Sequence, residues 1–283
     1  MKMGFTLNWL DHVLDLDLKT CVMGVLNVTP DSFSDGGQYL ESNKAVERGI
    51  TMAREGAAII DVGGESTRPY SRKIAVSEEL DRVVPVIEGL RKELGVLISI
   101  DTCKAEVAQG ALEAGASMIN DISALRFDPD MASIAAEAGV PVILMHMKGM
   151  PENMQKNPTY RDLIPEIFDF LEDAIERSVN AGIKRDLIIV DPGIGFGKTF
   201  DHNLKIIKAL SRFGALHRPV LLGTSNKAFI GHILGKEVYE RDTGTMATIA
   251  YGVINGAHIV RVHNVRKAVE TVRMIEAIRR GRV

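Results

Sequence analysis

Several residue types and patterns are scarce in this sequence, and each scarcity excludes a class of protein. The chain has only two cysteines, Cys21 and Cys103, too few for a disulfide framework or a multi-cysteine zinc site, which is typical of a reducing cytoplasm. No apolar run approaches the roughly 18 residues that a membrane helix requires. Asp11, Asp15 and Asp17 lie where a signal peptide would need an apolar stretch. We therefore expect a cytoplasmic protein with no membrane partner.

The chain also lacks a strong excess of charge of either sign. Its 34 lysines and arginines nearly balance 37 aspartates and glutamates, for a formal net charge of −3. A near-neutral chain has no general attraction for nucleic acid or for anionic membranes. With 46% hydrophobic and 25% charged residues among 283, the composition is that of a folded globular protein. We therefore expect no nucleic-acid partner.

Short apolar runs alternate with longer amphipathic segments along the whole chain. The apolar runs are rich in Val, Ile and Leu, as in strands buried on both faces of a parallel sheet. We expect strands at 21–26, 57–62, 96–100, 117–120, 140–145, 187–190, 219–222 and 258–262, and helices at 43–55, 77–94, 104–114, 130–138, 159–181, 202–213, 244–255 and 264–280. Eight even strand–helix units without a composition break favour a closed barrel over an open doubly wound sheet. The sequence thus predicts an α/β fold, a single (β/α)₈ TIM barrel domain over residues 1–283.

Polar residues end seven of the eight expected strands. In (β/α)₈ barrels the chemistry takes place at the carboxyl ends of the strands. The residues at these ends are Asn27, Asp61, Asp101, Asn120 with Asp121, His146, Asp191, and Arg261 with His263, whereas the seventh strand ends in Gly223, Thr224 and Ser225 shortly before Lys227. Any one of them could be a helix N-cap or a loop contact. Together they predict one polar site at the mouth of the barrel.

Two long loops follow the first two strands of the expected barrel. The first spans 27–37 and contains one aromatic residue, Phe33; it is either a surface connection or a lid that brings Phe33 and Asp35 over a substrate. The second spans 61–69, and its Arg68 could contact a phosphate or remain solvated. Arg261 and His263 share one face of an extended segment, which suits a phosphate or diphosphate as well as a salt bridge.

Nucleotide and zinc motifs are absent. Segment 191–199 is rich in glycine, but Pro192 occupies a position where a Walker A loop needs Gly, and Lys198 replaces the third Gly of a dinucleotide-binding loop. No cluster of His and Cys has the spacing of a zinc site, so we expect His146 to line the pocket. The acids and Asn27 instead suit a hard ion such as Mg²⁺ that is shared with substrate phosphates.

The two loops and the strand ends resemble the motifs of the dihydropteroate synthase family. The similarity extends from about Val22 to the end of the chain, through residues 27–37, 61–69, 99–102, 119–121, 191–198 and 261–263. The resemblance implies a (β/α)₈ barrel, commonly a homodimer, in folate synthesis. It implies a sulfonamide-target transferase that joins 6-hydroxymethyl-7,8-dihydropterin diphosphate to 4-aminobenzoate, releasing diphosphate.

The resemblance also assigns roles to individual residues. It implies that the pterin is bound by Asp101, Asn120, Asp191 and Lys227. It implies that Arg261 stacks on the pterin and, with His263, binds the diphosphate, and that Asn27 binds the diphosphate and is a Mg²⁺ ligand. It also implies that the aminobenzoate site is closed by Phe33, Thr67, Arg68 and Pro69. The residues expected to act in catalysis are Asp35, Arg68, Lys227, Arg261 and His263.

The sequence departs from the family in the seventh loop. The usual Ser-Arg-Lys-Ser is Ser225-Asn226-Lys227-Ala228 here, and the usual Arg-Val-His-Asp ends in Asn264. Ala228 lacks the hydroxyl that in the family helps hold the aminobenzoate carboxylate. The first backbone amides of a helix beginning near Lys227 are then expected to hold that carboxylate.

Two other functions are compatible with a pterin-binding barrel. One is a methyltransferase of the corrinoid type, which has no use for a diphosphate site; Asn27, the long first loop and the Arg261–His263 pair argue against it. The other is a non-catalytic pterin-binding paralogue, in which the first two loops would be expected to erode, whereas both are intact here.

Overall fold

Eight parallel strands form the centre of the structure, a computed structural model that describes residues 4–17, 19–29, 38–66, 73–93 and 95–282. The strands are β3 (Cys21–Asn27), β4 (Ile59–Gly63), β5 (Leu97–Asp101), β6 (Met118–Asp121), β7 (Val142–Met145), β8 (Ile188–Asp191), β9 (Leu221–Leu222) and β10 (Ile259–Val262). The sheet runs from β8 back to β3, then to β10 and β9. A parallel bridge between Val190 and Val220 joins its two edges. The sheet therefore closes into the barrel that the sequence predicts.

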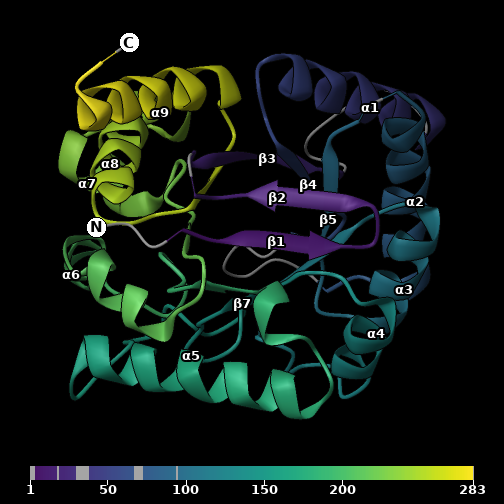
Figure 1. The fold of residues 1–283 in the computed structure, drawn as a ribbon, viewed down its shortest axis with the longest axis horizontal. Helices are drawn as coiled ribbons and strands as arrows, with labels where there is room; N and C mark the ends of the chain where they lie inside the picture. The colour runs from purple at the N-terminus through teal and green to yellow at the C-terminus, as the bar shows by residue number, and fades with distance from the viewer. Residues whose placement is uncertain (1–3, 18, 30–37, 67–72, 94, 283) are drawn as a thin grey trace.

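Helices surround this barrel on its outside (Figure 1). They are α1 (Gln38–Arg54), α2 (Val76–Glu93), α3 (Ala105–Ala114), α4 (Met131–Ala138), α5 (Leu163–Asn180), α6 (Phe200–Lys208), α7 (Ala228–Leu234), α8 (Asp242–Ile254) and α9 (Val265–Arg280), with short 3₁₀ helices η2 (Arg185–Leu187), η3 (Leu210–Leu216) and η4 (Val238–Glu240). None of the described helices combines the length and the apolar composition that crossing a membrane requires.

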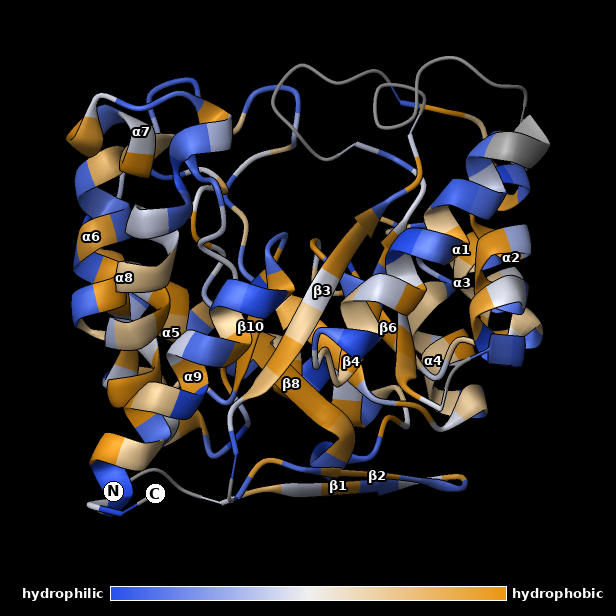
Figure 2. Ribbon diagram, turned by 90° about the horizontal axis from the view of Figure 1, so that it is seen from above, coloured by the Kyte–Doolittle hydropathy of each residue, from blue (hydrophilic) through white to orange (hydrophobic). Residues whose placement is uncertain are grey.

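The core lies between the strands and the inner faces of the helices. All five residues of β4 and all four of β8 are buried, as expected for strands covered on both faces. Hydrophobic and hydrophilic residues alternate along the helices (Figure 2), and on α2 the apolar residues Val83, Val86, Ile87 and Leu90 are buried. The spacing of three and four residues that predicted the helices therefore marks their inner faces.

Some helix ends differ from the sequence-based prediction: α1 begins at Gln38 rather than at 43, and two further differences have local causes. The expected helix 202–213 divides into α6 and η3, because Leu210, Phe213 and Leu216 are all buried and a spacing of three places side chains on one face of a 3₁₀ helix. The expected helix 159–181 begins at Leu163, since the Glu166 carboxylate accepts hydrogen bonds from the backbone N–H groups of Arg161 and Asp162 at 2.5 and 2.8 Å.

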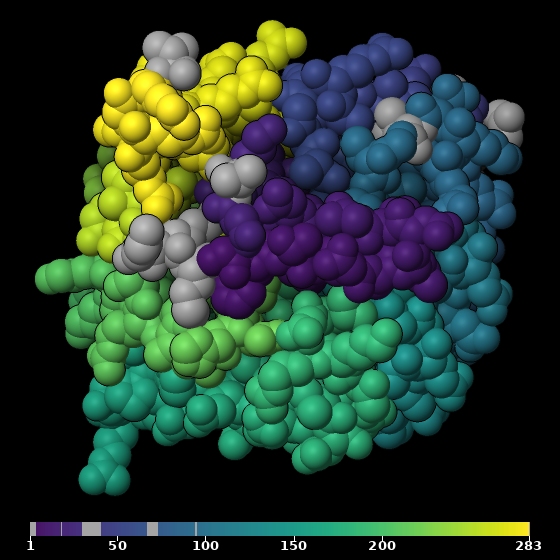
Figure 3. Space-filling model, viewed as in Figure 1, coloured from purple at the N-terminus to yellow at the C-terminus, as the bar shows by residue number. Residues whose placement is uncertain are grey.

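An amino-terminal hairpin that the sequence reading missed covers one end of the barrel. Its strands, β1 (Thr6–Trp9) and β2 (His12–Asp15), are antiparallel. Figures 1 and 3 show this hairpin in purple across the centre of the molecule, and Figure 2 shows it at the end opposite α7. Leu7, Trp9 and Leu14 are buried, and the Phe5 ring packs edge-on against His258, just before β10, at 5.1 Å. The hairpin thus closes the amino-terminal end and leaves the carboxyl ends of the strands for a site.

Lys104 connects the segment after β4 to α2 and α3. Its Nζ donates hydrogen bonds to Glu65 Oε2 at 2.6 Å, to Glu79 Oε2 at 2.6 Å and to the Ile74 carbonyl at 2.9 Å. The Glu79 side chain is 1% exposed. Burial raises the pKa of Glu79 above its usual value, and Lys104 opposes that rise. Glu79 is therefore a buried carboxylate that depends on one cation.

We expect Lys104→Met to lower the free energy of unfolding by about 3 kcal/mol at pH 8, because it leaves the Glu79 charge buried without a partner. Urea unfolding measures this. The loss should shrink toward pH 5, since Glu79 takes up a proton more readily in the folded variant than in its unfolded chain. Lys236→Met removes an ion pair with Glu240 whose side chains are 48% and 41% exposed, and this control should cost under about 1 kcal/mol. Equal losses in the two variants would contradict the role of Glu79.

Candidate active site

The polar residues at the carboxyl ends of the strands come together inside the mouth of the barrel. The registers place Gly63 of β4 beside Asp101 of β5, and Asp101 beside Asn120 of β6. Asp191 ends β8 beside Met145 of β7. The barrel therefore brings together side chains that lie far apart in the sequence, as the prediction from the strand ends requires.

Arg261 lies at the centre of this cluster. Its Nε donates to Asp61 Oδ2 and its Nη2 donates to Asp101 Oδ2, both at 2.6 Å. Asn120 Nδ2 also donates to Asp61 Oδ2, at 3.0 Å. Burial alone would lower the pKa of Arg261, but Asp61 and Asp101 raise it above its usual value. The guanidinium is thus a permanent cation between two carboxylates.

Asp61 is a site residue that the sequence reading placed at a strand end but gave no role. Its side chain is fully buried, and its Oδ1 has no hydrogen-bond partner within the described part of the chain. The sequence signal was its position on β4, two residues before the strand ends. Its reach to Arg261, 200 residues away, is visible only in the closed barrel.

Opposing effects act on the pKa of Asp101. Burial raises its pKa from 3.8 to about 7, the Arg261 charge works against this rise, and the negative charge of Asp61 adds to it. Burial also raises the pKa of Asp191, and the Gly193 N–H, which donates to Asp191 Oδ1 at 2.7 Å, opposes that rise. Two of the predicted acids therefore hold a proton more readily than free aspartate does.

Lys227 lies beside Asp191 and above an aromatic ring. Its Nζ is 4.2 Å from the centroid of the Phe196 ring, within the range of a cation–π contact. Burial lowers the pKa of Lys227 to about 8, Arg261 lowers it further, and Asp191 and Asp101 oppose the shift. Phe196 is a second residue that the sequence reading did not assign to the site. The position of Lys227 agrees with its predicted place at the mouth.

His263 and Asn27 lie at the rim of the same opening. Ser225 Oγ and His263 Nδ1 are 2.9 Å apart, and the backbone N–H of His263 donates to Ser225 Oγ at 3.2 Å. Asn27 ends β3 beside Gly63 and is half-buried. The other predicted site residues, Phe33, Asp35, Thr67, Arg68 and Pro69, lie outside the described residues.

Three residues differ from the family pattern, and two of them, Asn226 and Asn264, make hydrogen bonds with nearby residues in the structure. Asn226 adopts a positive φ of 58°, and its carbonyl accepts a hydrogen bond from Arg241 Nη1 at 3.0 Å. Asn264 caps α9, since its side chain accepts the Lys267 N–H at 3.2 Å and donates to Asp242 at 2.8 Å. Ala228 is the first residue of α7.

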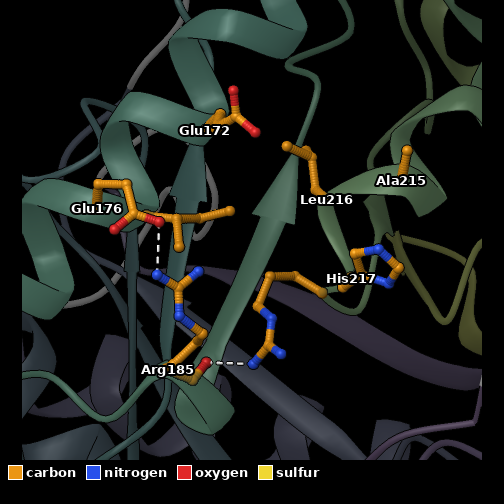
Figure 4. Close-up of a pocket in the computed structure, with 8 residues that line it drawn as sticks. Glu172, Glu176, Arg185, Ala215, Leu216 and His217 are labelled. Carbon is orange, nitrogen blue, oxygen red and sulfur yellow. Dashed lines mark hydrogen bonds and ion pairs between the residues drawn. The ribbon is translucent and has the colours of Figure 1, made fainter.

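A separate cavity of about 290 Å³ lies at the other end of the barrel (Figure 4). It is lined by Glu172, Ile175, Glu176, Arg185, Ala215, Leu216, His217 and Arg218, which lie on α5 or directly precede β8 and β9. Glu176 accepts from Arg185 Nη2 at 2.5 Å, and Arg218 donates to the Arg185 carbonyl. Glu176 and Arg185 thus pair with each other within the lining, and the cavity is remote from the strand-end cluster.

Comparisons with known proteins agree with this geometry. The family described as pterin binding enzyme matches residues 23–263. The dihydropteroate synthase of Bacillus subtilis is 49% identical over 92% of this chain and 89% of its own length. A Yersinia pestis dihydropteroate synthase with a sulfonamide drug complex is 43% identical, with a TM-score of 0.92 over 98% of this chain and 100% of its own. The Xanthomonas albilineans dihydropteroate synthase in complex with 7,8-dihydropteroate is 40% identical, with a TM-score of 0.87 over 95% of this chain and 97% of its own.

The arrangement around Arg261 predicts how Asp61 affects its neighbour. We expect Asp61→Asn to lower the pKa of Asp101 from about 7 toward 3.8, because it removes a like charge and leaves the guanidinium to Asp101 alone. Carboxyl ¹³C NMR titration measures this, with the exposed Asp130→Asn as a control that should change nothing.

The raised pKa of Asp101 also makes the free energy of unfolding depend on pH. The pKa of Asp101 is higher in the folded chain than its usual 3.8. Its contribution to the free energy of unfolding is therefore fully present below pH 3.8 and is lost as the pH rises through about 7. Asp61→Asn should flatten this decline in the free energy of unfolding. A pKa of Asp101 that stays near 7 in the variant would contradict the arrangement.

Proposed function

The chain belongs to the dihydropteroate synthase family of pterin-binding enzymes, and we propose that its own strand-end residues carry out that family's reaction. It is a transferase of folate synthesis that condenses 6-hydroxymethyl-7,8-dihydropterin diphosphate with 4-aminobenzoate. The products are 7,8-dihydropteroate and diphosphate. The observation that carries the assignment of residues is the cluster of Arg261 with Asp61, Asp101 and Asn120 inside the barrel.

We infer that the buried acids bind the pterin. The aminopyrimidinone edge of a pterin presents several N–H donors, which carboxylates and an amide oxygen can accept. Asp101, Asn120 and Asp191 offer such acceptors in a water-poor setting, where each hydrogen bond is stronger than in solution. Lys227, buried beside Asp191, would donate to the pterin carbonyl and ring nitrogen.

The diphosphate is assigned to the cationic side of the mouth. Arg261 remains charged at every working pH, and its planar fork can bind a phosphate in two places while its face stacks on the pterin. His263 directly follows β10, the strand of Arg261 itself, and Asn27 ends the neighbouring strand β3. To bind diphosphate, Arg261 must give up part of its contact with Asp61 and Asp101, which frees Asp101 to accept from the pterin.

These residues favour a reaction in which the bond to the leaving group breaks first. The aromatic amine of 4-aminobenzoate is a weak nucleophile, whereas diphosphate held by cationic side chains is a good leaving group. The dihydropterin ring can delocalise a cation at its methylene carbon. Arg261 and His263 would stabilise the departing charge and the barrel would hold the amine in line, so that no covalent enzyme nucleophile is needed.

The residues present fit a Mg²⁺ ion bound together with the diphosphate. The Asn27 amide oxygen is a hard ligand of the kind that Mg²⁺ accepts, and Mg²⁺ retains several waters. Within the described ranges no group of three or more His, Cys, Asp or Glu side chains could hold a metal, so substrate oxygens and water would supply most ligands. Bound there, Mg²⁺ would neutralise part of the charge on the leaving diphosphate.

We also propose that the chain forms homodimers in the cytoplasm. Large apolar side chains are exposed on α7, η4 and α8, namely Ile233, Leu234, Val238, Tyr239, Tyr251 and Ile254. α7 and α8 lie together on one side of the barrel (Figure 1), and η4 connects them in the chain. Exposed large apolar side chains on adjoining elements are typical of an interface between protein chains.

A turnover assay tests this function directly. Incubation with the pterin diphosphate and 4-aminobenzoate should release diphosphate and 7,8-dihydropteroate in equal amounts when Mg²⁺ is present. Excess chelator should abolish turnover without unfolding the chain, as circular dichroism can verify, and added Mg²⁺ should restore it. Full activity in excess chelator would contradict the metal assignment, and binding of pterin without any diphosphate release would contradict the enzymatic one.

A further inference from the structure

The glycine-rich segment after β8 directs its lysine into the protein rather than toward a ligand. Lys198 is 2% exposed. Its Nζ lies 2.9 Å from His146 Nδ1, 3.3 Å from the His146 carbonyl oxygen and 2.9 Å from the Phe196 carbonyl oxygen. A sequence pattern close to a phosphate-binding loop therefore serves an internal purpose here.

Lys198 Nζ has three hydrogen-bond partners, and all three are neutral groups. Burial lowers the pKa of Lys198 well below its usual value, and the charge of Asp191 opposes this. Burial also lowers the pKa of His146 to about 2, so the imidazole is neutral and its Nδ1 can accept. Three hydrogen bonds at one buried nitrogen then hold together the end of β7 and the loop 192–199.

The surrounding backbone leaves this loop little freedom. The His146 N–H donates to the Asp191 carbonyl at 2.9 Å, and the Tyr160 hydroxyl donates to the Gly197 carbonyl at 2.8 Å. Gly193 has a φ of +71°, and a Cβ there would collide with the His146 carbonyl oxygen. The loop therefore fits tightly against β7, with the Lys198 amine inside the turn.

The outer side of the same loop supports Lys227. The Phe196 ring faces Lys227 Nζ at 4.2 Å. Gly195, with a φ of +84°, passes so close to the Lys227 side chain that a Cβ would lie 3.0 Å from its Cδ. One face of the loop thus binds Lys198, and the other confines Lys227 at the site.

We propose that Lys198 is a positioning residue for the pterin site: its three hydrogen bonds hold the loop 192–199 so that Gly195 and Phe196 confine the amine of Lys227. The proposal rests on the function proposed above for Lys227. Lys198 itself touches no substrate. Its loss acts by releasing Lys227 into water, where the amine no longer has a fixed direction.

Lys198→Met tests this, because methionine fills a similar volume but donates nothing. We expect the pKa of Lys227 to rise from about 8 toward 10.5, since burial is the main cause of its lowering. NMR of ¹³C-labelled lysine measures that pKa without any substrate, with the signal assigned by its loss in Lys227→Met. We also expect kcat/KM for the pterin diphosphate to fall about tenfold, within the loss that misplacing a binding group causes. Lys208→Met, at an exposed lysine of α6, should leave both quantities unchanged.

A second pair of variants keeps the test valid if Lys198→Met does not fold. His146→Asn retains an oxygen acceptor close to the position of Nδ1, whereas His146→Leu removes it. We expect the pKa of Lys227 and the pterin KM to shift more in His146→Leu than in His146→Asn. Variants that lose stability but keep the Lys227 pKa and the pterin KM of the parent would overturn the proposal. A parent chain that shows the predicted Lys227 pKa shift on mutation but no turnover would contradict the proposed function instead.

Discussion

The guanidinium of Arg261 lies 2.6 Å from carboxylate oxygens of both Asp61 and Asp101, and the mouth of the barrel depends on this arrangement. Buried carboxylates this close to one another repel, and each is costly to keep charged away from water. A permanently charged guanidinium offsets both effects, and Asn120 adds a further donor to Asp61. The cluster can therefore hold several acids in an apolar barrel and still offer them to a polar substrate.

The closed barrel makes such a cluster possible. Arg261 and Asp61 are 200 residues apart in the sequence, yet β10 and β4 both flank β3. All the strands are parallel, so their carboxyl ends open on the same side, and the hairpin β1–β2 covers the other. The helices outside the barrel stabilise the fold, for example through the ion pair of the buried Glu79 with Lys104. The residues at the strand ends form the candidate active site.

Much of this could be read from the sequence, and the failures have physical causes. Alternation of apolar runs and amphipathic segments predicted the barrel, because burial alone sets those patterns. Strand-end residues such as Asp101, Asp191 and Arg261 were predicted for the site. The hairpin was missed because Thr6–Trp9 is short and only half-buried. The roles of Asp61 and Lys198 could not be predicted, since each depends on a partner from another strand or loop whose distance no local pattern records.

Arg261 is proposed to bind both the diphosphate and the face of the pterin, so the most direct measurement is the kinetics of Arg261→Lys with both substrates. Lysine keeps the charge but loses the planar face and the paired donors. We predict that kcat/KM for the pterin diphosphate falls about 10- to 150-fold, equivalent to roughly 1.5–3 kcal/mol for one lost charge-assisted contact. A lysine variant within a factor of two of the parent would contradict the central role of the guanidinium.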